Sequence, residues 1–241
     1  MKKKGQYIYE YKHPAVTADC VVFGYDGKEL KILLIKRGPE KEASSTAFTG
    51  SWALPGGFMD VDKDQTIAHT AQRELKEETG LKLGIKDFRE VAAFSDRDRD
   101  PRERVITIAH YALVKLAAVE ASTDAEKAEW FSMKDIPSLA FDHDQILRVA
   151  CSRLRQDIHF EPVGFDLMPE IFTLPQLQNL YESILEVKFD RRNFANKMKH
   201  FGMLTVVEDG TPRHGTRTPI KYRFDKENYD RLKAKGFQLE F

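Results

Sequence analysis

The apolar residues near the start of the chain fall into two short runs separated by a turn. The runs at 15–23 and 30–35 are rich in β-branched and aliphatic side chains, and Tyr25-Asp-Gly-Lys28 lies between them. Asp-Gly between two apolar runs is a strong hairpin signal. We therefore predict an antiparallel strand pair at the start of the fold.

Later apolar runs follow either a strand period or a helix period. Residues 105–116 form a strand-like run in which Val105, Thr107 and Ala109 fall at alternate positions, whereas the apolar residues of 144–154 recur every three to four positions. This order of elements is that of a mixed sheet sandwiched by helices, which places the first half in the α/β class. Further strands are expected at 52–55, 83–95 and 129–131.

The pattern changes after about residue 158, where several prolines punctuate the chain. Thr173 is expected to cap one helix, and Asp190 is expected to cap a second helix at 191–200. Two strands, at 204–208 and 220–224, then flank a turn rich in glycine, proline and threonine. Helix, turn, helix and β-hairpin is the order of a winged helix-turn-helix, a small α+β domain.

Length and composition support two domains. The chain has 241 residues, 41% of them apolar, and we place the domains at 1–158 and 159–241. Lys plus Arg and Asp plus Glu both total 38, so the global charge indicates no particular partner. Cys20 and Cys151 fit free thiols in a reducing cytosol. Without a long apolar run or a signal peptide, we expect a cytoplasmic protein with no membrane segment.

Three carboxylates lie on one face of a predicted helix between Asp64 and Gly80. Glu74, Glu77 and Glu78 stand at positions i, i+3 and i+4. Their charges repel one another, and hard divalent cations are natural counter-ions for such oxygen ligands. A solvated acidic helix is the alternative. Asp64 is expected to be the N-cap and Gly80 the left-handed residue after the helix. The opposite face, which should pack into a core, carries Ile67, Ala71 and Leu75.

This segment resembles the Nudix box, Gly-x5-Glu-x7-Arg-Glu-U-x-Glu-Glu-x-Gly-U, in which U is aliphatic. Residues 73–81 match every defined position. Gln65 stands where the family has a glutamate, and the stretch from Gly57 to Gln65 is two residues longer than usual. The resemblance implies an α/β Nudix fold that acts on diphosphates with Mg²⁺ or Mn²⁺ as cofactor.

By this resemblance, the catalytic residues are Arg73, Glu74, Glu77 and Glu78. Glu77 and Glu78 would be the main metal ligands, Glu74 a further ligand or base, and Arg73 a brace for the carboxylates. Gln65 keeps an oxygen ligand but removes a negative charge, which should weaken a second or third metal site. The bound cation would neutralise pyrophosphate oxygens and position or activate a water.

Further segments are candidates for ligand contacts. Gly56 and Gly57 should let the backbone turn sharply before the helix. Residues 96–104 form a dense run of alternating charges that is either a solvated loop or, as similar runs in ADP-ribose-handling Nudix domains imply, a ligand site. There, Arg99 and Arg102 could grip a diphosphate or stack on an adenine. We also expect the polar loop 36–50 to face the substrate, and Phe141-Asp142-His143 to form a helix-start capping cluster rather than a ligand contact.

Positive charge is concentrated in the second half. Between residues 188 and 223, nine cationic side chains stand against three anionic ones, and such a patch suits DNA phosphates. A recognition helix meets base edges with its N-terminal residues, while a wing skirts the backbone. A dimerisation module is the alternative reading of this domain. The candidate DNA-binding residues on the helix and the wing are Arg191, Arg192, Lys197, Arg213 and Arg217.

Nearly the whole chain, including 172–182 and 191–194, resembles Nudix-related transcriptional regulators of the NrtR and AraR type. Members sense a small ligand with the Nudix domain and bind operator DNA as homodimers. The resemblance implies a homodimeric regulator that binds ADP-ribose or a related nucleoside diphosphate and double-stranded operator DNA. Many members have a decayed Nudix box, so the resemblance itself leaves hydrolysis open. Because residues 73–81 keep the box, we expect this chain to retain Mg²⁺-dependent pyrophosphohydrolase activity. The alternatives are a plain ADP-ribose pyrophosphatase with a C-terminal dimerisation module, and a sugar sensor with a vestigial box.

Overall fold

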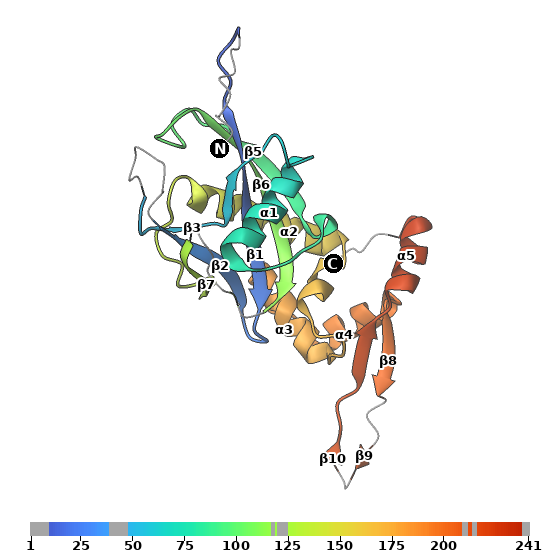
Figure 1. Ribbon diagram of the computed structural model, residues 1–241. Coiled ribbons are helices and arrows are strands. Elements are labelled where there is room, and N and C mark those ends of the chain that lie inside the picture. Colours follow the sequence, from blue (N-terminus) through green and yellow to red (C-terminus); the bar gives the residue numbers. More distant parts are fainter. Residues whose placement is uncertain are drawn as a thin grey trace.

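The computed structural model describes residues 10–38, 48–116, 119, 125–208, 212–213 and 216–237 (Figure 1). The strands are β1 (Ala15–Tyr25), β2 (Leu30–Arg37), β3 (Trp52–Ala53), β4 (Gly56–Phe58), β5 (Arg89–Phe94), β6 (Val105–Lys115), β7 (Ala125–Ser132), β8 (Leu204–Glu208), β9 (Pro212–Arg213), β10 (Thr216–Arg217) and β11 (Lys221–Phe224). The α-helices are α1 (Ile67–Thr79), α2 (His143–Phe160), α3 (Leu174–Leu185), α4 (Arg191–His200) and α5 (Lys226–Ala234). Short 3₁₀ helices occur at Ile85–Asp87 and Val163–Leu167.

Seven strands form one mixed sheet in the first part of the chain. Its path is β3-β2-β1-β6-β5, with β4 paired to β1 and β7 paired to β2. β1 and β6 are parallel and the remaining pairs are antiparallel. Tyr25 pairs with Leu30 across the predicted hairpin, so that prediction is confirmed.

The side chains of the sheet alternate between two apolar layers. Cys20 and Val22 of β1 join the layer that contains Ala71 and Leu75 of α1. Val21 and Phe23, the first between them and the second beyond, point to the opposite layer, which packs on α2. α1 and α2 therefore cover opposite faces of the sheet, as the predicted α/β sandwich requires.

Three elements differ from the prediction. The strand expected at 83–95 is shorter, because its first residues form a 3₁₀ turn in which the Asp87 carboxylate accepts a hydrogen bond from the Gly84 N–H. α2 continues to Phe160, which gives Ile158 a fully buried position. α5 was not predicted, since only Tyr229 of this polar helix is buried. None of the described helices is long and apolar enough to cross a membrane.

The second part has the predicted winged helix-turn-helix order. Thr173 caps α3 by accepting from the Gln176 N–H, and Asp190 caps α4 by accepting from the Asn193 N–H. β8 and β11 pair antiparallel, and β9 pairs with β10 farther along the same arm. In Figure 1 this wing extends away from the seven-stranded sheet.

One apolar core runs across the junction of the two parts. The cluster that contains Phe23 and Ile146 continues through Leu177 of α3 to Phe194 of α4. The domain boundary predicted between residues 158 and 159 falls in the last turn of α2, beside the buried Ile158. The domain boundary itself stays a prediction. Because the shared core includes residues on both sides of it, few residues near the boundary could form a flexible linker.

Candidate functional site

α1 directs two of its three box carboxylates toward β4. Glu74 and Glu78 reach a cavity there, and Glu78 Oε2 accepts a hydrogen bond from the Gly56 N–H at 2.8 Å. Glu77, on the same side of the helix, is 56% exposed. The helix ends at Gly80 in the left-handed conformation with a φ of 74°, as predicted.

Arg73 ties the loop before the helix to these carboxylates. Its guanidinium donates to both oxygens of Asp64 at 3.1 and 2.8 Å and to Glu74 at 2.6 Å. Further bonds reach Glu77 at 3.3 Å and the carbonyl of Phe58 at 2.9 Å. The bidentate pair holds the pKa of Asp64 down at about 2. Arg73 therefore fixes the loop and two carboxylates in one arrangement.

Asp64 is not the helix N-cap, so that prediction is wrong. Thr66 occupies the N-cap position without a side-chain cap. The Asp64 carboxylate instead accepts from the Thr70 hydroxyl at 3.0 Å and from Arg73. Gln65 is exposed and does not line the cavity. The carboxylate that partners Arg73 is thus that of Asp64, one position before Gln65, where the family has a glutamate.

Gly56 and Gly57 serve close approach rather than a sharp turn. Both lie in β4, paired with Asp19 and Ala18 of β1, and neither has a positive φ. A Cβ at Gly56 would lie 2.3 Å from the Ala18 carbonyl oxygen, and one at Gly57 would lie 2.5 Å from the Glu74 carboxylate. The predicted reason for these glycines is therefore wrong, since any larger residue would collide with β1 or α1.

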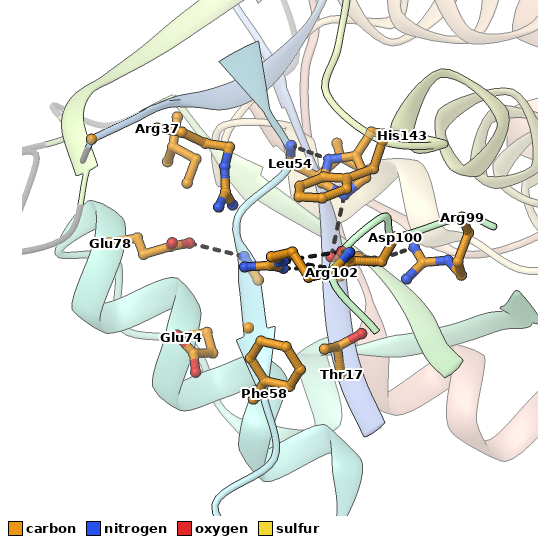
Figure 2. A pocket seen from close by; sticks show the side chains of 16 residues that line it. Thr17, Arg37, Leu54, Phe58, Glu74, Glu78, Arg99, Asp100, Arg102 and His143 are labelled. Carbon is orange, nitrogen blue, oxygen red and sulfur yellow. Dashed lines mark hydrogen bonds and ion pairs between the residues drawn. The ribbon is translucent and has the colours of Figure 1, made fainter. Parts of the chain in front are cut away.

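The carboxylates share a cavity of about 490 Å³ with the charged loop between β5 and β6 (Figure 2). Figure 2 shows Glu74 and Glu78 entering from α1 on one side of β4, and Arg102 and Asp100 on the other. Among the predicted site residues, Arg73 and Glu77 lie outside the lining. The complete lining is Thr17, Asp19, Ile35, Arg37, Gly38, Leu54, Gly56, Gly57, Phe58, Glu74, Glu78, Arg99, Asp100, Arg102, Phe141 and His143.

Arg99 is buried in the cavity wall between two carboxylates. Its Nε and Nη2 donate to the Asp142 oxygens at 2.8 and 2.7 Å, and Nη2 lies 3.3 Å from Asp19. Its side chain is 4% exposed, whereas Arg97 and Asp98 of the same loop are 90% and 94% exposed. The loop is therefore part solvated and part built into the site, and Arg99 is a fixed charge.

His143 lies in the same wall. Its Nδ1 accepts a hydrogen bond from the Leu54 N–H at 2.9 Å, so the neutral ring carries its proton on Nε2, 3.6 Å from Asp19 Oδ1. Burial lowers the pKa of His143, which favours this neutral form. The predicted capping cluster is wrong, because Asp142 makes no side-chain cap and His143 faces the cavity.

Arginine guanidinium groups and aromatic rings form another part of the lining. The Arg102 guanidinium carbon lies 5.4 Å from the Phe58 ring centroid and 5.3 Å from that of Phe141. The Arg37 guanidinium carbon lies 5.0 Å from the Phe141 centroid. Arg102 also donates to Asp100 at 2.8 Å. Such groups can stack on a nucleobase and pair with phosphate oxygens.

The carboxylates of the cavity suit a hard divalent cation. Burial raises the pKa of Glu78, and the charges of Glu74 and Asp19 raise it further. Burial likewise raises the pKa of Glu74. Among the described residues, no three His, Cys, Asp or Glu side chains are arranged as a metal site. Arg73 donates to Glu74 instead, and the Gly56 N–H donates to Glu78. Crowded buried oxygen donors are nevertheless the ligands that Mg²⁺ prefers, so the donor set fits such an ion.

The candidate DNA-binding residues lie on α4 and the wing. Arg191 and Arg192 are exposed in the first turn of α4, and Lys197 is exposed farther along the same helix. The backbone of Arg213 lies in β9 and that of Arg217 in β10. The side chains of these two arginines lie outside the described residues.

Comparison with known proteins assigns both parts of the chain. Residues 13–150 match the NUDIX domain family, and residues 164–224 match the NrtR DNA-binding winged helix domain. The ADPR responsive transcriptional repressor NtrR of Acinetobacter baylyi is 34% identical over 224 residues, which cover 92% of this chain and 86% of that protein. The chain belongs to the NrtR family of Nudix-related transcriptional regulators.

Solved structures agree with this family. Shewanella oneidensis NrtR in complex with a 27mer DNA superposes with a TM-score of 0.70 at 27% identity, covering 89% of this chain and 95% of that one. The NUDIX domain of the same protein with ADP ribose gives a TM-score of 0.54 at 31% identity, covering 60% of this chain and 90% of that one. The ADP-ribose pyrophosphatase of Methanocaldococcus jannaschii is 41% identical over 138 residues, 57% of this chain and 73% of that protein.

The cavity of this NrtR-family chain also contains residues that were not predicted. Asp19 was hidden in an apolar strand, where a lone carboxylate between buried neighbours was the available signal. Arg37 and Gly38 belong to the predicted loop 36–50, of which residues 39–47 lie outside the described residues. Phe58 and Phe141 have no periodic signal, because Phe58 ends the three-residue strand β4 and Phe141 lies just before α2.

Proposed function

We propose that this NrtR-family protein is an ADP-ribose-responsive regulator. Its Nudix domain binds ADP-ribose or a closely related nucleoside diphosphate, and its winged helix binds double-stranded operator DNA. The 490 Å³ cavity carries the proposal, because buried carboxylates face guanidinium and aromatic groups across it. The ADPR responsive repressor of A. baylyi and the ADP ribose complex of the S. oneidensis NUDIX domain support this choice of ligand.

The lining suits the three chemical parts of such a ligand. Arg37 and Arg102 are guanidinium groups that can pair with phosphate oxygens. Phe58 and Phe141 offer ring faces for a base. Arg99 is already matched by Asp142 and Asp19, so it adds little net charge and acts by shaping the wall around the ribose.

We further propose Mg²⁺- or Mn²⁺-dependent hydrolysis of the pyrophosphate bond. Glu74, Glu77 and Glu78 would hold the metal through carboxylate oxygens. When bound, such a cation would supply neutralisation of the phosphate oxygens and activation of a water for attack on phosphorus. Arg73 keeps Glu74 and Glu77 beside each other, and the Gly56 N–H orients Glu78.

DNA recognition would use both parts of the winged helix. Arg191 and Arg192, at the start of α4, would meet base edges, and Lys197 would contact phosphates. Arg213 and Arg217 would place the wing on the backbone or in the minor groove. Two copies in a homodimer would present two recognition helices to the half-sites of an operator. We place this DNA-bound regulator in the cytoplasm.

A gel shift with the DNA upstream of its own gene, with and without ADP-ribose, tests the proposal. We expect binding without ligand and release with it. Titration calorimetry with ADP-ribose tests the ligand separately. If the full-length protein binds no duplex at low salt, or no ADP-ribose, the regulator proposal is wrong. Hydrolysis is measured separately as release of AMP and ribose 5-phosphate with Mg²⁺ or Mn²⁺.

A plain ADP-ribose pyrophosphatase is the second candidate function. The 41% identity with the M. jannaschii pyrophosphatase over the Nudix domain favours it. In that case the C-terminal part would serve dimerisation alone. Hydrolysis together with a dimer that has no affinity for DNA would support this alternative.

A further inference from the structure

We infer that α2 transmits the occupancy of the Nudix cavity to the recognition helix, and that Arg155 is the positioning residue at its DNA-side end. The inference rests on the proposed function and adds the route by which the ligand acts. α2 is suited to this role because its two ends contact different parts of the regulator. In Figure 1, α2 runs from the sheet toward α3.

The first end of α2 belongs to the cavity. His143, its first residue, lines the cavity and bonds to the Leu54 N–H through Nδ1. Asp142, directly before it, holds Arg99 through two hydrogen bonds of 2.8 and 2.7 Å. A ligand that displaces either His143 or Arg99 therefore acts on the first turn of α2.

Near its other end, α2 contacts the C-terminal end of α3. Arg155 Nε donates to the carbonyl oxygen of Ile184 at 3.1 Å, and its Nη2 lies 2.8 Å from Glu186 Oε1. Ile184 is in the last turn of α3, and Glu186 is its C-cap in the left-handed conformation. The last carbonyls of a helix lack intrahelical partners and favour a cation. Arg155 thus holds the segment that leads directly into α4 at Arg191.

The stretch between these two ends is rigid. Residues 143 and 155 are about 18 Å apart along an α-helix, at 1.5 Å per residue. Ile146, Ala150 and Leu154 are buried along the face that packs on the sheet. A helix packed in this way shifts as a unit, so a small displacement at one end reaches the other.

α3 is also held by a second element, which supplies a fixed reference. The Leu30 N–H of β2 donates to the Ser183 hydroxyl at 2.9 Å, one residue before Ile184. The sheet therefore holds α3 at Ser183, while Arg155 of α2 bonds to Ile184 and Glu186. Movement of α2 against the sheet would tilt the end of α3 and change the direction of α4.

A variant of Arg155 tests this route. Arg155→Met keeps the aliphatic stem but removes the bonds to Ile184 and Glu186. We expect its affinity for operator DNA and, separately, for ADP-ribose to stay within about twofold of the wild type. The factor by which ADP-ribose weakens DNA binding, roughly 5–150-fold for a typical coupling, should fall below about twofold. Fluorescence anisotropy with labelled operator, with and without ADP-ribose, measures that factor.

Arg153→Met is the matched control. Arg153 lies on the same helix and pairs with Asp157 of that helix at 2.8 Å. This variant should keep the wild-type coupling factor. If Arg155→Met keeps it as well, or if Arg153→Met loses it equally, the route is wrong. A wild-type protein whose DNA binding ignores ADP-ribose would instead contradict the proposed function.

Glu186→Gln gives a second test that does not depend on the folding of Arg155→Met. It removes the ion pair with Arg155 and leaves the bond to the Ile184 carbonyl. We expect a coupling factor between those of the wild type and Arg155→Met, and an unchanged factor would overturn the inference. By reciprocity, operator DNA should weaken ADP-ribose binding to the wild type by the same factor.

Discussion

The Nudix cavity and the DNA-facing surface both depend on charge, but they hold it in opposite ways. In the cavity, Arg99 is 4% exposed between two carboxylates, and Glu78 is fixed by a backbone N–H. On the winged helix, the side chains of Arg191 and Arg192 are exposed and take part in no hydrogen bond or ion pair among the described residues. The cavity side chains are thus already held in place, whereas we expect the exposed arginines to become ordered when DNA binds.

This difference fits the function proposed for each region. Metal-assisted attack on a phosphorus atom would need groups held in fixed positions, as a buried network provides. DNA phosphates form a repeating line of charge, and flexible cations can adjust to it through counterion release. We therefore expect the cavity to respond mainly to pH and the DNA surface mainly to salt.

The largest expected effect concerns Glu78→Gln. Hydrolysis of ADP-ribose should fall on the order of 100-fold or more, as when a group that stabilises the transition state is lost. The same change should raise the melting temperature of the metal-free protein at neutral pH. The pKa of Glu78 is raised, so its carboxylate favours folding only when protonated, and that contribution is lost as pH rises through the folded pKa.

Calorimetric melting in EDTA checks this sign. The advantage of Glu78→Gln should grow from pH 5 to pH 8, by roughly 2–4 °C for each kcal/mol at this chain length. Glu77→Gln should also abolish hydrolysis, but it should leave the melting temperature unchanged because Glu77 is 56% exposed. Lys76→Gln, exposed on the same helix, is the control and should change neither property. A lower melting temperature for Glu78→Gln would contradict the argument.

The DNA surface should behave differently under substitution. Arg191→Ala or Arg192→Ala should lose roughly 1–3 kcal/mol of discrimination between operator and unrelated duplex. Arg213→Ala or Arg217→Ala should weaken binding to all sequences and flatten the salt dependence by roughly one unit per lost phosphate contact. Competition binding over a range of salt separates the two patterns. None of these variants should alter hydrolysis. If Arg191→Ala weakens binding to every DNA sequence equally, Arg191 contacts the DNA backbone rather than the bases.

Asp64→Asn tests the brace beneath the cavity. Loss of the charge-assisted bonds to Arg73 should destabilise the protein by about 1.5 kcal/mol. The pKa of Asp64 lies at about 2 in the folded protein, below its ordinary value of 3.8. Its stabilisation is therefore present above about pH 4 and lost as pH falls through 2. Urea unfolding at pH 7 and pH 3 should show a smaller difference between wild type and variant at pH 3.

Gln65→Glu should have the smallest effect. Gln65 is exposed and outside the cavity lining, so its replacement should change stability by less than about 0.5 kcal/mol. Metal affinity and hydrolysis should also stay the same, because Asp64 already occupies the place beside Arg73. A clear rise in Mg²⁺ affinity, measured by calorimetry, would show that Gln65 reaches the metal and that the loop rearranges.

Local patterns predicted much of this molecule. The hairpin, the box helix with its Gly80 end, and both caps of the helix-turn-helix follow from residues close together in the chain. Turn geometry and helical period are short-range properties that a sequence specifies directly. Capping was predicted correctly at Thr173 and Asp190 but wrongly at Asp64 and Asp142, whose carboxylates bind the distant residues Arg73 and Arg99 instead.

The remaining features depend on pairing between distant segments. Asp19 meets Arg99 and His143 only because β1 lies between β4 and β6 in the sheet. Gly56 and Gly57 of β4 are required because β1 and α1 approach them closely. This approach cannot be predicted from the residues next to them in the sequence. Arg73 binds Asp64 and not Gln65 because of the path of the lengthened loop. Along this path the Asp64 side chain is buried, whereas that of Gln65, one residue later, is exposed.

The apolar core that crosses the junction restricts how this protein can change in evolution. Leu177, Leu180 and Ile184 of α3 are buried against the same cluster as the sheet and α2. A substitution in one of these α3 side chains changes the packing of the sheet and α2 as well. We therefore expect the buried residues of α3 to change in evolution together with those of α2 and the sheet that they contact.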